Sequence, residues 1–166
     1  MTAESYQKLT AWWRAHPSVL CAMLFVNKAL KYLGYIAYPL LLVLVALFDR
    51  EMFARMFFVP LVGFVVVTVV RRVVDEPRPY EALAIDPLIH KDTVGKSFPS
   101  RHLFSMVMIA MCWLAWCMPV GIVFLVLCAV MGYVRVVGGV HYVHDVLVGA
   151  LLGVVFGIVG FWVVPM

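Results

Sequence analysis

The longest uncharged segment of the chain constrains its fold more than any other feature. Residues 103–134 contain no Asp, Glu, Lys or Arg. As one helix, the segment would extend about 48 Å at about 1.5 Å per residue, whereas the hydrocarbon core of a bilayer is about 30 Å thick. Met118-Pro119-Val120-Gly121 supplies a turn near its middle. The sequence therefore predicts two membrane-spanning helices joined by this turn.

Three other apolar segments read as membrane spans. They cover residues 146–166, residues 52–70 with Pro60 as a kink, and residues 33–48, which end at Asp49-Arg50-Glu51. Hydrophobic residues make up 65% of the chain and charged residues 13%, against about half and about a quarter in soluble domains. We therefore expect an all-α fold, a polytopic transmembrane helix bundle of five or six spans. Residues 1–166 should form a single membrane-embedded domain.

The N-terminal segment, residues 1–32, leaves the number of spans open. Within residues 12–31, one helical face is polar and carries Asn27, Lys28 and Lys31. Trp12 and Trp13 in the same segment suit the headgroup region of a bilayer. We favour an amphipathic helix lying in the interface over a sixth spanning helix. Residues 1–10 carry Glu4 and Lys8 and lack a basic region followed by an apolar core, so we expect no cleaved signal peptide.

Small residues recur on one face of the last predicted span. Gly149, Gly153 and Gly157 are spaced four residues apart, which permits the close approach of another helix. We expect this row to pack within the bundle rather than to form a dimer contact. The sequence assigns no oligomeric state.

Polar residues gather in three short blocks, at residues 71–79, 99–102 and 135–145. The span over residues 52–70 ends at the first block, the helical hairpin begins at the second and returns to the third, and the last span leaves from the third. All three blocks are therefore expected on one membrane face. The sizeable polar loop, residues 80–98, is expected to cap the site, and its charged and histidine residues are Glu81, Asp86, His90, Lys91, Asp92 and Lys96.

The arginines of these blocks suit a phosphate group. A phosphoryl group in transfer spreads negative charge over its oxygens, and planar guanidinium groups hold such charge with paired hydrogen bonds. Arg71, Arg78 and Arg135 come from the first and third blocks and are candidates to converge on one phosphate. Prolines flank Arg78 on both sides and stiffen its backbone. Arg72 is expected instead to extend to the headgroups as a positive anchor.

The second and third blocks contain the residues suited to proton transfer and nucleophilic attack. Ser100 stands where the helix beginning near His102 needs its N-cap, and the free amide groups of a helix N-terminus also bind anions. His102 is a candidate general acid for the departing alkoxide. His141 and Asp145 are four residues apart and would share a helix face, so the carboxylate would fix the imidazole tautomer and leave the other nitrogen as the nucleophile. In-line attack would give a phosphohistidine that water hydrolyses. His144 lies near the same face, and this argument separates it only weakly from His141.

The charge pattern argues against a nucleic-acid or metal partner. The net charge of +4 is modest, and several of the positive charges fall in the three blocks. A metal ion usually needs three or four protein ligands, and the surrounding arginines would repel it. We therefore expect no cofactor, no metal and no nucleic acid, with a lipid phosphate and the membrane lipids as partners.

In order and spacing, the three blocks resemble the signature of the type 2 phosphatidic acid phosphatase superfamily. That signature is a Lys, six residues and Arg-Pro, followed by Pro-Ser-Gly-His, followed by Ser-Arg, five residues, His, three residues and Asp. The matching elements in this chain are Arg71 with Arg78-Pro79, Pro99-Ser100-Arg101-His102, and Arg135 with His141 and Asp145. The resemblance covers about residues 52–166, and its spacing selects His141 over His144.

The resemblance implies a role for each matching residue. It makes His141 the nucleophile, Asp145 its partner and His102 the general acid. It assigns phosphate binding, without a metal, to Arg71, Arg78, Ser100 and Arg135.

Three positions depart from the signature. Arg71 replaces Lys, Arg101 replaces Gly and Val134 replaces Ser. Arg101 is the most serious departure, because a glycine lets the backbone approach the phosphate closely. Its guanidinium is a candidate for binding a second phosphate.

The leading interpretation is an integral-membrane lipid phosphatase. The small bacterial members that the chain resembles imply undecaprenyl pyrophosphate, phosphatidylglycerol phosphate or phosphatidic acid as the substrate. The alternative is a non-catalytic lipid-phosphate binder or transporter with the same pocket. Vanadium-dependent haloperoxidases of the same superfamily are soluble, so the predicted spans weigh against that role.

Two arguments bear on the membrane face that carries the site. Family members more often act on the outer face of the cell membrane, where we expect the active site. The basic residues that five spans would place on the same face, Lys8, Arg14, Lys28 and Lys31, favour the cytoplasmic face by the positive-inside tendency.

Overall fold

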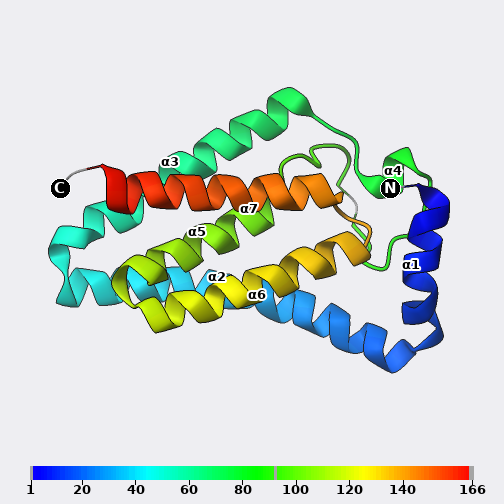
Figure 1. Ribbon diagram of the computed structural model, residues 1–166, viewed down its shortest axis with the longest axis horizontal. Coiled ribbons are helices and arrows are strands. Elements are labelled where there is room, and N and C mark those ends of the chain that lie inside the picture. Colours follow the sequence, from blue (N-terminus) through cyan, green and yellow to red (C-terminus); the bar gives the residue numbers. More distant parts are fainter. Residues whose placement is uncertain (1, 92, 165–166) are drawn as a thin grey trace.

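Five long helices lie along one axis of the computed structural model, which describes residues 2–91 and 93–164 (Figure 1). They are α2 (Pro17–Phe48), α3 (Arg50–Val74), α5 (Arg101–Trp116), α6 (Met118–Val137) and α7 (Val143–Ile158), which continues into a π-helical turn (Val159–Val163). A shorter helix, α1 (Ala3–Ala15), lies across one end, near the single turn α4 (Pro79–Ala82). Four residues of the predicted elements lie outside the described residues: Met1 of the N-terminal segment, Asp92 of the cap loop, and Pro165 and Met166 of the last span.

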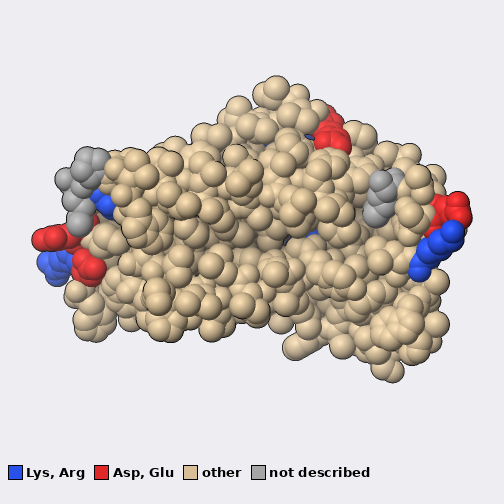
Figure 2. Space-filling view, in the orientation of Figure 1, with Lys and Arg blue, Asp and Glu red and all other residues tan. Residues whose placement is uncertain are grey.

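The fold is the predicted all-α membrane bundle. In the described residues, four helical segments are long and apolar enough to cross a membrane, and α5 is a shorter apolar helix. In the most apolar 18-residue stretch of each segment, between 22% and 44% of the residues are buried inside the protein. Most residues of these stretches are therefore accessible from outside the bundle. Figure 2 shows charged atoms near the two ends of the molecule and a long uncharged surface between them. This surface matches the hydrocarbon core of a bilayer, with the charges at its two faces.

The predicted helical hairpin is confirmed. Cys117 ends α5 and begins α6, and a proline occupies the first turn of α6, where its missing N–H breaks no hydrogen bond. Gly121 allows the two helices to meet closely, because a Cβ there would lie 2.4 Å from the backbone of Leu114. The turn therefore falls at Cys117, directly before the predicted Met118–Gly121 segment, which forms the first turn of α6.

The predicted boundary between an N-terminal interfacial segment and a span beginning at residue 33 is wrong. Helix α2 is continuous over 32 residues from Pro17, and the break in the chain lies at His16. Pro17 can begin a helix but cannot continue the preceding one, which explains the position of the break. The separate helix α1 is capped by Thr2 and Ser5, which exchange side chain to backbone hydrogen bonds. The described part of the chain therefore has five helices along the bundle axis and no sixth.

The glycine row of α7 packs within the bundle, as predicted. A Cβ on Gly149 would lie 2.6 Å from the carbonyl oxygen of Ser100, and one on Gly157 would lie 2.7 Å from the Met111 side chain. Gly153 makes a similar approach to Val107. The row therefore brings the backbone of α7 against α5 and places the start of α5 beside the start of α7.

Replacing Gly149 with valine should lower the unfolding temperature of the detergent-solubilised protein. The new side chain would collide with the Ser100 backbone, and overpacking of this kind costs about 1–3 kcal/mol. Thermal unfolding monitored by circular dichroism measures the effect. Leu151→Phe, which adds volume at an exposed position of the same helix, is the control and should leave the melting temperature nearly unchanged. Equal melting temperatures for Gly149→Val and the wild type would contradict this packing.

The loop between α4 and α5 is a packed cap. Leu88 and Ile89 are buried against residues of α2 and α6. The Ile89 amide donates to the Gly138 carbonyl at 3.1 Å, and the Leu88 amide donates to the Tyr6 hydroxyl of α1 at 3.2 Å. The cap and α1 therefore lie together over one end of the bundle, the end where α3 and α6 finish and α5 and α7 begin (Figure 1).

Candidate active site

A buried histidine and carboxylate lie under the cap. His141 is 1% exposed and Asp145 is fully buried. The Nδ1 atom of His141 lies 3.2 Å from Oδ2 of Asp145, and the Ser97 hydroxyl donates to the same oxygen at 2.5 Å. Because a carboxylate only accepts hydrogen bonds, this contact places the imidazole proton on Nδ1 and leaves the lone pair on Nε2. The pair therefore has the arrangement of an oriented nucleophile.

The pair forms at a helix start rather than along one helix face. Helix α7 begins at Val143 with Tyr142 as its N-cap, so His141 precedes the helix. Asp145 lies in the first turn and accepts from the Tyr142 amide at 2.9 Å. One carboxylate thus caps the helix and orients the histidine. The predicted pairing holds, but the predicted shared helical face does not.

Burial keeps His141 neutral. The loss of solvation and the positive charges of Arg78 and Arg135 outweigh the hydrogen bond to Asp145, and the pKa of His141 is lowered to about 4. An imidazole with this pKa is unprotonated at neutral pH. The free Nε2 lone pair is therefore available to attack an electrophile.

Two of the predicted arginines bind backbone carbonyl groups around the site. Nη1 of Arg71 donates to the Ser97 carbonyl at 3.1 Å and to the Pro99 carbonyl. Arg78 donates from Nε to the Gly95 carbonyl at 3.0 Å and from Nη1 to the Val140 carbonyl at 3.1 Å. Both side chains are buried. They hold the cap and the turn before α7 together and bring two permanent positive charges under the cap.

Two buried polar groups near the pair, the Arg135 guanidinium and the Ser100 hydroxyl, have atoms without hydrogen-bond partners in the described part of the chain. Arg135 is 2% exposed, and its Nε has no hydrogen-bond partner among the described residues. Ser100 is fully buried and begins α5 as predicted, yet its hydroxyl makes no capping hydrogen bond and has no other described partner. Buried polar atoms normally have partners, so an anion that accepts from both would explain them. The backbone amides at the start of α5 point to the same conclusion.

Lys91 adds a fourth cation that the sequence pattern did not single out. It lies half-buried in the cap. Burial and the positive charges of Arg78, Arg135 and Arg71 together lower the pKa of Lys91 to about 7. So many cations in one place are unfavourable without an anion between them. The arrangement therefore suits an anion such as a phosphate group, beside the neutral imidazole of His141.

Comparison with known proteins agrees with this chemistry. The family model of the PAP2 superfamily matches residues 52–166. The chain belongs to the PAP2 superfamily.

Solved PAP2-like structures share the whole fold. LpxE of Aquifex aeolicus is 25% identical, with a TM-score of 0.74 over 96% of this chain and 93% of that one. A transmembrane PAP2-type phosphatidylglycerolphosphate phosphatase from Bacillus subtilis is 23% identical, with a TM-score of 0.57 over 93% of this chain and 90% of that one. The second likeness concerns the fold alone.

A curated sequence relative covers less. The bacitracin transport permease protein BcrC of Bacillus licheniformis is 35% identical over 89 residues. The match spans 52% of this chain and 44% of that relative. The chain therefore matches less than half the length of the curated relative.

Arg101, which replaces the glycine of the PAP2 signature, is exposed and lies against the Phe64 ring. It is the first residue of α5, and its ordinary helical backbone accommodates an arginine without strain. The side chain is exposed, with its guanidinium carbon 5.4 Å from the centroid of the Phe64 ring. His102 follows it and lies within electrostatic range of Arg135 and His141. Arg101 is thus exposed where Arg71, Arg78 and Arg135 are buried, although its charge lies within electrostatic range of Arg71.

Three residues near the site, Glu76, His144 and Asp145, have side chains of the kinds that bind metal ions. Atoms of Glu76, His144 and Asp145 that could bind a metal lie within 4.8 Å of one another. Nε2 of His144 lies 3.1 Å from a carboxylate oxygen of each of the other two. This contact places His144 on the outer side of Asp145, opposite His141. The expected absence of a metal stays a prediction.

Ser97 is the clearest residue that sequence reasoning missed. It is fully buried, it donates to Asp145, and its carbonyl accepts from Arg71. No motif marks it, because it belongs to the cap and meets Asp145 only through the fold. The available signal in the sequence was a serine two residues before the second PAP2 block.

Proposed function

We propose that the chain is an integral-membrane lipid phosphatase that hydrolyses a lipid phosphate or diphosphate through a phosphohistidine intermediate, without a metal. The observation that carries the proposal is the buried His141–Asp145 pair beside the unpartnered polar atoms of Arg135 and Ser100. Undecaprenyl pyrophosphate, phosphatidylglycerol phosphate and phosphatidic acid are the candidate substrates. Membership of the PAP2 superfamily supports this reaction class.

The proposed reaction has two steps. Nε2 of His141 attacks phosphorus while the cations neutralise the oxygens of the phosphoryl group. The bond from phosphorus to the leaving oxygen breaks, and His102 gives that oxygen a proton. Water then attacks the phosphohistidine, the phosphorus–nitrogen bond breaks, inorganic phosphate leaves, and His102 recovers the proton from the water.

Phosphate release from a panel of lipid phosphates tests the function. Purified full-length protein in detergent is given the three candidate substrates in the presence of a chelator, and inorganic phosphate is measured. We expect turnover of at least one substrate without added metal. No release from any of them, together with tight binding, would support the alternative of a non-catalytic binder or transporter. The transport name of the BcrC relative favours that alternative.

Replacing Lys91 with arginine should extend activity to higher pH. Lys91, with its pKa lowered to about 7, is charged below pH 7 and loses its charge as the pH rises through 7. Because the charged form attracts phosphate, kcat/KM of the wild type should fall over this range, and a permanently charged arginine should retain it. The measurement is a pH profile of kcat/KM. Lys96→Arg, at an exposed position of the cap, is the control, and identical alkaline limbs for wild type and Lys91→Arg would contradict this role.

We place the active site on the extracytoplasmic face, on the resemblance to the family. Single cysteines introduced into a Cys21→Ser variant test this placement. Cys21 is replaced because it is exposed and would itself react with the label. In intact cells, a membrane-impermeant maleimide should label Val94→Cys, in the cap, and leave Asp49→Cys, at the opposite end of the bundle, unlabelled. Val94 is 83% exposed, so labelling reports accessibility rather than burial. The reverse labelling pattern would place the site in the cytoplasm.

A further inference from the structure

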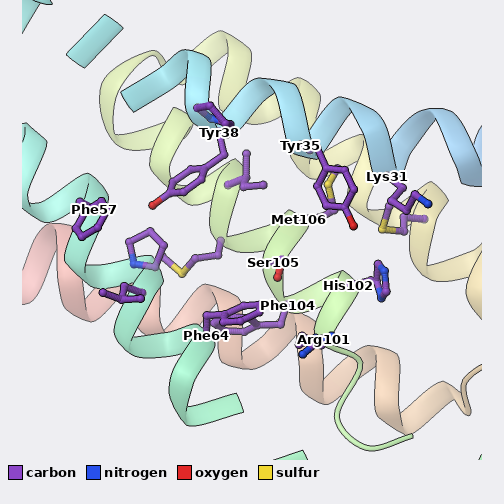
Figure 3. A pocket seen from close by; sticks show the side chains of 17 residues that line it. Lys31, Tyr35, Tyr38, Phe57, Phe64, Arg101, His102, Phe104, Ser105 and Met106 are labelled. Atoms are coloured by element: carbon purple, nitrogen blue, oxygen red, sulfur yellow. The ribbon is translucent and has the colours of Figure 1, made fainter. Parts of the chain in front are cut away.

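A cavity lies beside the candidate active site and opens sideways from the bundle. It has a volume of about 630 Å³ and lies between α2, α3 and α5; we call it the lateral pocket (Figure 3). Its walls are mostly apolar and include Tyr38, Phe57, Leu61 and Met108. Phe57 and Leu61 are also exposed on the surface of the spans. The lateral pocket therefore offers a hydrocarbon chain a path between the bilayer and the bundle.

One end of the lateral pocket is cationic. Lys31 from α2 and Arg101 from α5 line this end, with His102 beside them (Figure 3). In the part of the chain that the structure describes, neither cation forms an ion pair with a carboxylate. The aromatic rings near them, Tyr32 at 5.0 Å from the Lys31 ammonium and Phe64 near Arg101, leave both charges unneutralised. An anion at this end would complement them.

His102 connects the lateral pocket to the buried arginines. It lines the lateral pocket and lies within electrostatic range of Arg135 and His141. In the proposed reaction, the group that leaves phosphorus departs on the side of His102. That group therefore emerges toward Lys31 and Arg101.

We propose that Lys31 and Arg101 form a second phosphate subsite, which binds the phosphate that stays on a lipid diphosphate while its chain occupies the lateral pocket. The inference rests on the proposed phosphatase function and selects its substrate class. An alcohol leaving group needs one proton and no lasting counter-charge. A phosphate monoester leaving group carries negative charge throughout, and two cations beside it stabilise both the bound substrate and the departing product.

The reaction balances with a diphosphate. Nε2 of His141 bonds to the terminal phosphorus, and the bond from that phosphorus to the bridging oxygen breaks. The electron pair stays on the bridging oxygen, which becomes part of the lipid monophosphate held by Lys31 and Arg101 and takes a proton from His102. Water then hydrolyses the phosphohistidine, so the sum is lipid diphosphate and water giving lipid monophosphate and inorganic phosphate.

Neither proposed ligand is a residue that the PAP2 signature specifies. Lys31 precedes the matched residues 52–166, and Arg101 stands where the signature has glycine. The subsite therefore does not follow from the signature, and restoring the glycine at position 101 is a direct test of it.

The experiment compares two substrates with the same hydrocarbon chain. Initial rates of phosphate release from farnesyl diphosphate and farnesyl monophosphate are measured with purified full-length protein in detergent. The wild type should show a higher kcat/KM for the diphosphate. Arg101→Gly and Lys31→Met should each lower the ratio of the two kcat/KM values by about 10- to 100-fold, the effect of losing a charge-assisted hydrogen bond. Lys31→Arg should keep the ratio, and Lys28→Met, at an exposed position of α2, is the matched control.

The possible outcomes separate the subsite from the proposed function. A wild type that hydrolyses both substrates but keeps the same ratio in Arg101→Gly and Lys31→Met would overturn the subsite and leave the phosphatase intact. Equal losses on both substrates would show that the cations hold a bystander phospholipid or shape the pocket, and would also overturn it. A wild type that releases no phosphate from either substrate would instead overturn the proposed function.

Discussion

Replacing His141 with alanine should lower phosphate release by about four orders of magnitude or more, the scale of losses seen when a catalytic nucleophile is removed. The imidazole is the group under the cap that is held by Asp145, kept neutral by burial and left with a free Nε2. Steady-state turnover of a lipid phosphate measures the loss. Rapid quenching with labelled substrate should trap an acid-labile, alkali-stable phosphoenzyme in the wild type and none in His141→Ala.

His144→Ala is the matched control for this prediction. His144 is three residues away in the sequence, is 54% exposed and contacts the other oxygen of Asp145. Its loss should change turnover by about tenfold at most, since among the described residues His144 forms a hydrogen bond neither with His141 nor with the oxygen of Asp145 that holds the His141 imidazole. Both variants should unfold at nearly the wild-type temperature. Full turnover in His141→Ala, or a phosphoenzyme that survives the substitution, would remove His141 from its proposed role.

Replacing Arg135 with methionine should separate activity from stability. A buried guanidinium with an unpartnered Nε, within electrostatic range of Arg78, is poorly placed for folding and well placed to hold an anion. We expect kcat/KM to fall by about 100- to 1,000-fold, as when one donor to a transition-state oxyanion is removed. We expect the unfolding temperature to stay the same or to rise. Turnover and thermal unfolding in detergent measure the two effects.

Arg72→Met provides the comparison for Arg135. Arg72 is exposed at the end of α3, where a headgroup contact is expected. Its substitution should change neither turnover nor unfolding temperature by much. A marked loss of stability in Arg135→Met would mean that Arg135 serves the fold, contrary to the proposal.

Some of the local structure could be predicted from the sequence of a single segment. The turn at Cys117 followed from a proline and a glycine within an uncharged run too long for one span. The glycine row of α7 predicted close packing, which Gly149 and Gly153 make against α5. By contrast, the start of α2 was misplaced, because Lys31 reads as an interfacial residue in the sequence but lines a pocket within a continuous helix.

The geometry of the site depended on contacts between distant segments. The spacing of His141 and Asp145 suggested a pair on one helix, but the pair forms because Asp145 caps α7 and accepts from the residues before it. Ser97 completes the pair from the cap, 48 residues away in the sequence. Spacing within one segment predicts neighbours on a regular helix and cannot predict a partner that another segment brings.

The sequence alone determined that the chain crosses a membrane, that its three polar blocks lie on one face, and that its block spacing resembles that of PAP2 proteins. Hydropathy and spacing are local properties, and the bilayer converts them directly into spans and sides. Tertiary structure alone decided that Ser97 and Lys91 join the buried site and that Arg101 turns to the lateral pocket, where Lys31 also lies. These placements depend on how the cap and five helices pack, because packing between distant segments sets the direction of each side chain.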